Sequence, residues 1–391
     1  PKSNGLYITG KFAKLDDDTI KMYMDQSNTS SLPLPLKEID ISADEVNLVG
    51  QRLTAAALQI VPNADKWEVN IHSQEIVGEM IVPKDLSANG LITAQFEKMN
   101  LRTAVVTKKT SPISAKSLPA ISFVANTFSY NDMPLGRIAF KTSPNNNGMS
   151  IDILSINSPR LSLQAGGSWT QANVTRLQGK AKSSQVTELL NSLDLDATNF
   201  LVKDGEATFS LNWSDAPYAP NLASLNGRAS LKLGRGRIVD IGEASGAKMD
   251  VGKMLSIFSL QTIPRRLTFD FSDIFQKGYS FDFIRGDFSL QRGDVFTDNL
   301  NFDGPVARVH IDGRIGLKKH DVNFVLSVTP YVTSSIPVAA TLLTMQPLVG
   351  IAAFAVDKVI GTSKVVTHYY QVRGDWDNPS WTAISSQVNS K

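Results

Sequence analysis

Residues 36–63 read LKEIDISADEVNLVGQRLTAAALQIVPN, and the same pattern returns 82 residues later in residues 118–145, LPAISFVANTFSYNDMPLGRIAFKTSPN. The two segments match without a gap, so that Ile41, for example, corresponds to Phe123. In both, apolar residues alternate with polar ones, which is typical of a strand with one apolar and one polar side. We therefore expect internal repeats of strands that extend a sheet in one direction.

Further alternating runs follow, separated by turn-forming residues such as Arg292-Gly293-Asp294. About 20 strands at a spacing of about 4.8 Å would give a sheet on the order of 95 Å long. The expected fold class is mostly β: an elongated, twisted, repetitive antiparallel β-sheet groove, half-open and solenoid-like, with a few short helices and a C-terminal apolar helical hairpin. The further runs are residues 5–12, 161–169, 206–212, 224–233, 265–271, 279–290, 306–317, 322–328 and 364–373.

Three short segments are expected to form helices. Residues 16–24 (DDDTIKMYM) place acidic side chains in a first helical turn, and residues 183–193 (SSQVTELLNSL) have a serine cap followed by Glu188. Residues 246–260 (GAKMDVGKMLSIFSL) carry an apolar side. The last two segments could lie on a membrane surface or cap the sheet, and capping is the commoner arrangement.

Residues 336–356 (IPVAATLLTMQPLVGIAAFAV) lie in a gap between Asp321 and Asp357 that contains no charged residue and no histidine. A single bilayer-spanning helix needs about 20 apolar residues, but Pro347 would interrupt it. We therefore predict a hairpin of two apolar helices, each about 15 to 20 Å long, that either dips into a membrane or plugs the end of a sheet. The expected membrane contacts are Ile336, Val338, Leu342, Leu343, Met345, Leu348, Val349, Ile351 and Phe354.

The composition excludes several classes of function. The 391 residues include 39 basic and 37 acidic residues and no cysteine. This balance lacks the electrostatic footprint of a nucleic-acid-binding protein, and without cysteine there is no thiol catalysis, thiolate zinc site or disulfide. The four histidines show neither metal-ligand spacing nor a nucleophile-base-acid order. We therefore expect no catalytic activity, no metal site and no cofactor.

Two arginine-containing segments are candidates for phosphate contact. Arg265 and Arg266 could bind a lipid phosphate, because guanidinium groups match phosphate oxygens, or could lie in an exposed turn paired with Asp270 or Asp273. Residues 234–237 (GRGR) lack the third glycine, the lysine and the helix of a phosphate-binding loop, so a turn is predicted there.

Four segments of the second half occur in a characteristic order, with the uncharged stretch before the last of them. They are LASLNGRASLKLGRGRIVDI (222–241), LSIFSLQTIPRRLTFDFSDIFQKGYSFDFIRGDFSL (255–290), DNLNFDGPVARVHIDGRIGL (298–317) and VRGDWDNP (372–379). In this order they resemble the C-terminal region of the YhdP branch of the AsmA-like family, which also includes TamB. The upstream repeats follow the same pattern more loosely.

The resemblance implies an envelope-spanning, bridge-like transporter that conducts phospholipid between the inner and outer membranes of a Gram-negative bacterium and supports the outer-membrane barrier. It implies a periplasmic β-groove with an inner-membrane anchor at its N-terminal end and an outer-membrane contact at its C-terminal hairpin. Other envelope proteins are further expected partners. The chain opens in a strand-like pattern with no signal peptide, so we expect it to be part of a longer protein whose N-terminal anchor is missing.

A half-closed apolar sheet would shield acyl chains from water, at about 0.8 kcal/mol per buried CH₂. Transport along it needs no catalytic residue. The alternative is a non-conducting envelope scaffold that binds proteins through exposed β edges. The residues expected to line the groove are Ile39, Ile41, Leu48, Ile121, Phe123, Tyr130, Phe209, Leu211, Phe281 and Phe283.

The expected organisation has four parts. Residues 1–182 form a repetitive β-groove segment, and residues 183–330 form a further β-groove with short amphipathic helices. Residues 331–363 form the apolar hairpin, and residues 364–391 form a closing strand with a polar tail.

Leu343→Asp or Phe354→Asp is expected to weaken binding to phospholipid liposomes several-fold, because a carboxylate is costly to bury in an apolar phase. Co-sedimentation with liposomes measures the binding, and Asn389→Asp in the polar tail is the control. Unchanged binding would show that the hairpin is an internal plug.

Overall fold

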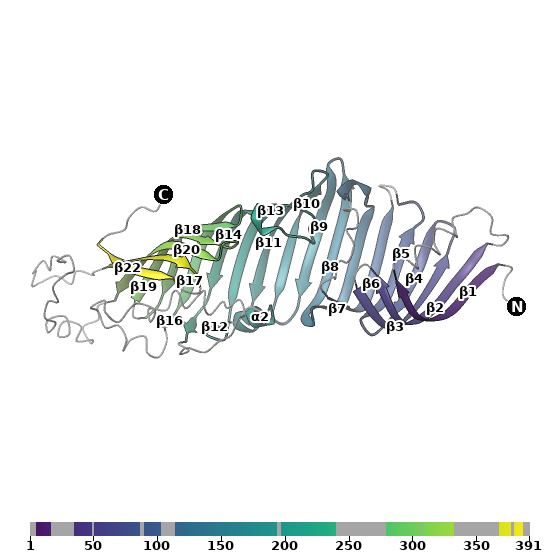
Figure 1. The fold of residues 1–391 in the computed structure, drawn as a ribbon, viewed down its shortest axis with the longest axis horizontal. Helices are drawn as coiled ribbons and strands as arrows, with labels where there is room; N and C mark the ends of the chain where they lie inside the picture. The colour runs from purple at the N-terminus through teal and green to yellow at the C-terminus, as the bar shows by residue number, and fades with distance from the viewer. Residues whose placement is uncertain are drawn as a thin grey trace, which may run out of the picture. The chain divides into compact units, whose positions relative to one another are not determined.

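The computed structural model is mostly β, as expected (Figure 1). It divides into two compact units. Unit 1 comprises Pro1–Lys182 and Asn212–Pro220, and unit 2 comprises Ser183–Leu211 and Asn221–Lys391. The finer division into four parts stays a prediction. The structure describes residues 5–16, 35–48, 51–86, 90–102, 114–193, 197–239, 279–305, 307–331, 367–376 and 379–385.

In unit 1 each strand pairs with the next strand along the chain. All of these pairs are antiparallel except β1–β2 and β6–β7, which are parallel. The strands are β1 (Leu6–Asp16), β2 (Leu36–Leu48), β3 (Gln51–Pro62), β4 (Lys66–His72), β5 (Ile76–Pro83), β6 (Leu91–Leu101), β7 (Ala120–Tyr130), β8 (Met133–Asn145), β9 (Gly148–Asn157), β10 (Ser162–Thr170) and β11 (Val174–Ser183).

The predicted repeat corresponds to groups of antiparallel strands that are joined by a parallel step. The first group is β2 to β6 and the second is β7 to β11, so β2 corresponds to β7 and β3 to β8. A parallel pair needs a long connection between its strands, and between β6 and β7 this connection contains the 3₁₀-helix η1 (Ala115–Ser117). The sheet of unit 1 is therefore antiparallel, as expected, except at the parallel steps β1–β2 and β6–β7.

Tight turns fix the register of two hairpins. Asn131 and Asp132 connect β7 and β8 with φ angles of 49° and 63°. Arg292 and Gly293, with φ angles of 52° and 83°, connect two strands of unit 2 at a turn expected from the sequence. Two consecutive residues with positive φ match the twist of antiparallel strands, and Asn, Asp and Gly tolerate this conformation best.

Unit 2 contains a larger antiparallel sheet and a small sheet. In the larger sheet β14, β17, β18, β19, β20, β21 and β22 pair in this order, and the small sheet has the order β12-β15-β16. The elements are α2 (Val186–Ser192), β12 (Phe200–Val202), β13 (Gly205–Ser214), η2 (Leu222–Ser224), β14 (Asn226–Leu233), β15 (Gly236–Ile238), β16 (Tyr279–Phe281), β17 (Phe283–Gln291), β18 (Asp294–Asp303), β19 (Ala307–Gly316), β20 (Asp321–Pro330), β21 (His368–Asp375) and β22 (Ser380–Ile384).

The small sheet is made of the bent ends of longer strands. Asp204 precedes β13, Gly234 follows β14 and Asp282 precedes β17, and at these points the chain leaves one sheet for the other. Gly234 N–H donates to Asp204 O at 3.0 Å, and Asp282 N–H donates to Asp303 O at 2.7 Å. The single strand expected over residues 279–290 is therefore two strands. We call β12, β15 and β16 together the corner.

Of the expected helices, the one at residues 183–193 is confirmed as the shorter α2. The serine cap is wrong: Gln185 occupies the cap position without a side-chain cap, and Ser183 Oγ accepts from Gln185 N–H at 3.0 Å. The prediction that a helix begins at Asp16 is also wrong, because Asp16 is the last residue of β1.

Several other expectations fall on residues outside the described ranges. They are the rest of the helix at 16–24, the helix at 246–260, the strand at 265–271 and the apolar hairpin. In the ranges that are described, no helix combines the length and the apolar character needed to cross a bilayer.

The core of unit 2 is closely packed on one face of its larger sheet. Leu326 and Val372 are fully buried and Ile311 is 1% exposed. On the opposite face, Arg314 joins β18 and β20 through Asp294 Oδ1 at 2.8 Å and Asp321 Oδ2 at 2.6 Å. The hydrogen bond from Arg314 lowers the pKa of Asp321, despite an opposing effect of burial.

Leu326→Ala is expected to lower the free energy of unfolding by about 2 to 5 kcal/mol, because it leaves a cavity in this core. Urea denaturation measures the change. Leu201→Ala, at a position that is 45% exposed, is expected to cost less than about 0.5 kcal/mol. Equal losses for the two variants would contradict this description of the core.

Candidate functional site

One face of unit 1 carries two continuous rows of small and apolar side chains, which we call the apolar face. Residues paired across neighbouring strands point to the same face, and so do residues two apart in one strand. The first row runs through Ile8, Ile39, Ile60, Val69, Met80, Ala94, Phe123, Phe140, Leu154 and Ala165, and the second through Gly10, Ile41, Leu58, Ile71, Gly78, Phe96, Ala125, Ile138, Ile156 and Leu163.

Much of the apolar face is only partly buried. Ile39, Ile60 and Phe123 keep intermediate exposure, whereas Ala125 is fully buried and Phe96 is 6% exposed. Phe96 and Phe123 lie in ring contact, with centroids 5.8 Å apart. A sheet normally packs its apolar face against another layer, and contiguous exposed apolar surface marks a binding site. The apolar face is therefore the best candidate site in unit 1.

At one end, unit 1 curls toward the apolar face. Gln51 Nε2 in β3 donates to Arg102 O at 2.7 Å, and Arg102 N–H donates to Gln51 Oε1 at 2.9 Å. In a flat sheet β3 and β6 would be about 14 Å apart, because β4 and β5 lie between them. Leu53 and Met99, on the same side, are buried at 5% and 8% exposure. This end of the face is therefore a cup.

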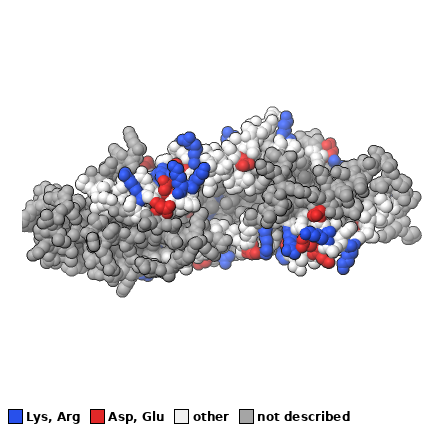
Figure 2. Space-filling view, viewed as in Figure 1, with Lys and Arg blue, Asp and Glu red and all other residues white. Residues whose placement is uncertain are grey.

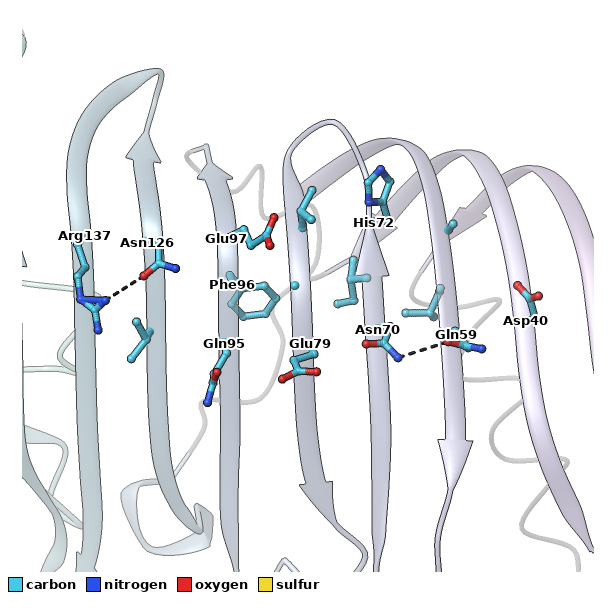
Figure 3. Close-up of a pocket in the computed structure, with 16 residues that line it drawn as sticks. Asp40, Gln59, Asn70, His72, Glu79, Gln95, Phe96, Glu97, Asn126 and Arg137 are labelled. Atoms are coloured by element: carbon cyan, nitrogen blue, oxygen red, sulfur yellow. Dashed lines mark hydrogen bonds between the residues drawn. The ribbon is translucent and has the colours of Figure 1, made fainter.

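The opposite face of unit 1 is mainly polar, and a hollow of about 850 Å³ there is lined mostly by its side chains, together with Leu58, Ile71 and Phe96. Figure 3 shows Asp40, Gln59, Asn70, Glu79 and Gln95 in a row across β2 to β6, and Asn70 Nδ2 donates to Gln59 Oε1 at 3.4 Å. Lysine and arginine side chains intermix with aspartate and glutamate on the visible surface in Figure 2. The row of polar residues marks this face as the water-facing side of the sheet.

In unit 2 the corner and α2 pack against the apolar face. Phe281 is 1% exposed, and its ring lies 6.0 Å from that of Phe200 and 6.3 Å from that of Phe302. Val186 of α2 and Leu300 of β18 belong to the same core. The apolar face of unit 2 is thus closed where that of unit 1 is accessible.

The structure brings some of the predicted groove residues together. Ile39, Ile41, Ile121 and Phe123 share the apolar face of unit 1. Tyr130, at the end of β7, pairs with Leu101 and is 39% exposed. Leu48 ends β2, and its side chain lies outside the described part of the chain.

The predicted groove residues of unit 2 do not form one surface. Phe209 and Leu211 alternate with the exposed residues Thr208 and Ser210 in β13, as expected for one strand face. Phe283 lies on the polar side of β17, opposite to the side of its buried neighbours, because the chain bends at Asp282.

Phe281 and Phe283 are therefore not brought together. Phe281 lies in the core, whereas the Arg285 guanidinium lies 4.9 Å from the centre of the Phe283 ring. All of the predicted membrane contacts, together with Arg265 and Arg266, lie outside the described residues. Their roles, like the lipid-lining roles, stay predictions.

Sequence reasoning missed several residues of the apolar face, including Ile60, Met80, Phe96 and Phe140. Each continues a row that passes through a predicted residue. Phe140 had a usable signal, because it corresponds to Leu58 in the 82-residue repeat. To predict the other three residues, one has to know how neighbouring strands pair. The sequence of a single strand does not show this pairing.

The polar side of unit 2 holds a hydrogen-bonded group around Asp303. Tyr331 Oη donates to Asp303 Oδ1 at 2.6 Å, and Arg308 Nη2 donates to Asp303 Oδ2 at 2.8 Å. Burial raises the pKa of Asp303, but the hydrogen bonds from Tyr331 and Arg308 together lower it by more. The pKa of Asp303 therefore lies below its usual value. Within the described ranges, no three His, Asp or Glu side chains are grouped so that they could hold a metal ion.

Comparison with known proteins gives two matches. A family model described as YhdP protein matches residues 1–381. The Escherichia coli K12 protein named intermembrane phospholipid transporter YhdP is 30% identical over 230 residues, which cover 58% of this chain and 18% of that relative. The chain thus aligns with less than a fifth of the relative's length. No solved structure matches significantly.

Gln51→Ala is expected to speed amide hydrogen exchange at Arg102 about fivefold, because the variant removes the hydrogen bonds that close the cup. Exchange measured by mass spectrometry tests this, and Gln178→Ala at an exposed position of β11 is the control. An unchanged rate at Arg102 would show that the curl does not depend on this contact.

Proposed function

The chain belongs to the YhdP family, and from this premise we propose that it conducts phospholipid, with the acyl chains lying on the apolar face of unit 1. The partly exposed rows of that face carry the proposal. Each CH₂ that leaves water contributes about 0.8 kcal/mol. An acyl chain that lies on these rows is therefore stabilised, because its CH₂ groups and the partly exposed side chains both leave water. The polar headgroup stays in water at the edge of the sheet.

The geometry of unit 1 supports movement along the sheet. Both rows cross from β1 to β10 without a charged residue. Strands about 4.8 Å apart give a path on the order of 45 Å. Apolar contacts are non-directional, so a lipid can pass from one strand to the next without breaking a specific bond.

The setting of this activity is part of the proposal. The relative's name describes an intermembrane phospholipid transporter. We place the chain in the periplasm of a Gram-negative bacterium, held to the inner membrane by an upstream anchor and touching the outer membrane through the hairpin at residues 331–363. There it would support the outer-membrane barrier. Transport of this kind uses no catalytic residue, cofactor or metal, so the proposed function is not enzymatic.

A photo-crosslinking amino acid at Phe123 is expected to capture phospholipid from liposomes at least about tenfold more than one at Val124. The two positions are neighbours in β7, and successive side chains of a strand point to opposite faces. Mass spectrometry of the crosslinked protein measures the capture. Equal background at both positions, with no copurified lipid, would overturn the proposal and favour a scaffold that binds proteins through its β edges.

A further inference from the structure

Part of the apolar face of unit 2 is covered by the corner, because the Phe281 ring lies 6.3 Å from that of Phe302. Leu300 and Phe302 of β18 are 6% and 3% exposed, and Ile284 of β17 is 2% exposed. Phe200 and Phe281 of the corner belong to the same core. The corner therefore covers apolar side chains of unit 2, whereas the corresponding side chains of unit 1 have no such cover among the described residues.

Helix α2 is fastened to β12 through Thr187 and, next to it, through the hydrogen bond from Val186 N–H to Lys203 O at 3.0 Å. Thr187 Oγ1 lies 2.6 Å from Phe200 O and 3.1 Å from Val202 O, and it accepts from Val202 N–H at 2.8 Å. Val186 of α2 is 7% exposed in the core. The helix and β12 are thus held together as one piece.

In the described part of the chain, polar contacts between the corner and the larger sheet lie at the bends. At the bends, Gly234 N–H donates to Asp204 O, and Asp282 N–H donates to Asp303 O. The ion pair between Arg235 and Asp282 is 3.3 Å long, with side chains 85% and 51% exposed, so it adds little. Mainly apolar contacts hold the corner down, and they are contacts that an acyl chain can also supply.

We propose that α2 and the corner form a lid over the apolar face of unit 2, and that an acyl chain of a phospholipid takes the place of Phe200 and Phe281 against Leu300 and Phe302 when the lid lifts. This inference rests on the proposed function. The closed lid makes unit 2 a gate, because an acyl chain competes with the lid for the same surface. The hydrogen bonds of Thr187 hold α2 against β12, so their loss lets α2 leave the core more readily and favours the open state.

Thiol labelling tests the lid, because the chain has no cysteine and each introduced thiol is unique. The probe is N-dodecylmaleimide, whose alkyl chain mimics a lipid tail. Ile39→Cys reports the open face of unit 1, and Leu300→Cys reports the surface under the lid. Leu300→Cys is expected to react at least about tenfold more slowly than Ile39→Cys, because it is reached only from a minor open state.

Adding Thr187→Val is expected to speed labelling of Leu300→Cys about fivefold, because the variant keeps the side-chain shape but loses the hydrogen bonds that hold α2 on β12. Helix α2 can then leave the core more readily. Labelling of Ile39→Cys should not change, which also shows that the protein is folded. Thr208→Val, at an exposed position of β13, is the matched control. Phe200→Ala, which removes an apolar contact of the lid, should also speed the reaction of Leu300→Cys.

Vesicles of phosphatidylethanolamine and phosphatidylglycerol separate the two proposals. They should slow labelling of Ile39→Cys and, in the Thr187→Val background, of Leu300→Cys. If neither Thr187→Val nor Phe200→Ala speeds labelling of Leu300→Cys, or if vesicles protect Ile39→Cys alone, the lid proposal is overturned. If vesicles protect neither thiol, the proposed function itself fails.

Discussion

The alternation of apolar and polar residues has to remain in register from strand to strand, because a shift by one residue turns a whole strand's apolar side chains to the other face. In unit 1 the pairing keeps Ile39, Ile60 and Val69 in one row. The row continues across the parallel step, where Ala94 pairs with Phe123. The apolar face is therefore continuous although the chain crosses the sheet between β6 and β7.

The two units shield their apolar faces from water in different ways. Unit 2 bends three strands at Asp204, Gly234 and Asp282 and covers part of its apolar face with the corner and α2. Unit 1 curls at the end where Gln51 meets Arg102 and leaves much of the face partly exposed. Exposed apolar area costs about 25 cal/mol per Å². A lipid tail that covers this area recovers that free energy, which drives its binding to the face.

Local sequence patterns predicted straight strands well and bent strands poorly. The alternation in residues 36–63 and 118–145 was enough to put Ile41 and Phe123 on apolar strand faces. The same rule failed for Phe281 and Phe283, which would share a face in a straight strand. The bend at Asp282 separates them, and the hydrogen bond from Asp282 N–H to Asp303 O that marks it joins residues distant in the sequence.

The sequence by itself determined the strand periodicity, the 82-residue repeat and the absence of thiol chemistry, because each depends only on residue type and spacing. The parallel steps, the bends and the cover over unit 2 depend on contacts between distant segments, such as Thr187 with Phe200. Which apolar face stays accessible was therefore decided only by the tertiary structure. Accessibility is set by what packs above a side chain, and no local pattern contains that information.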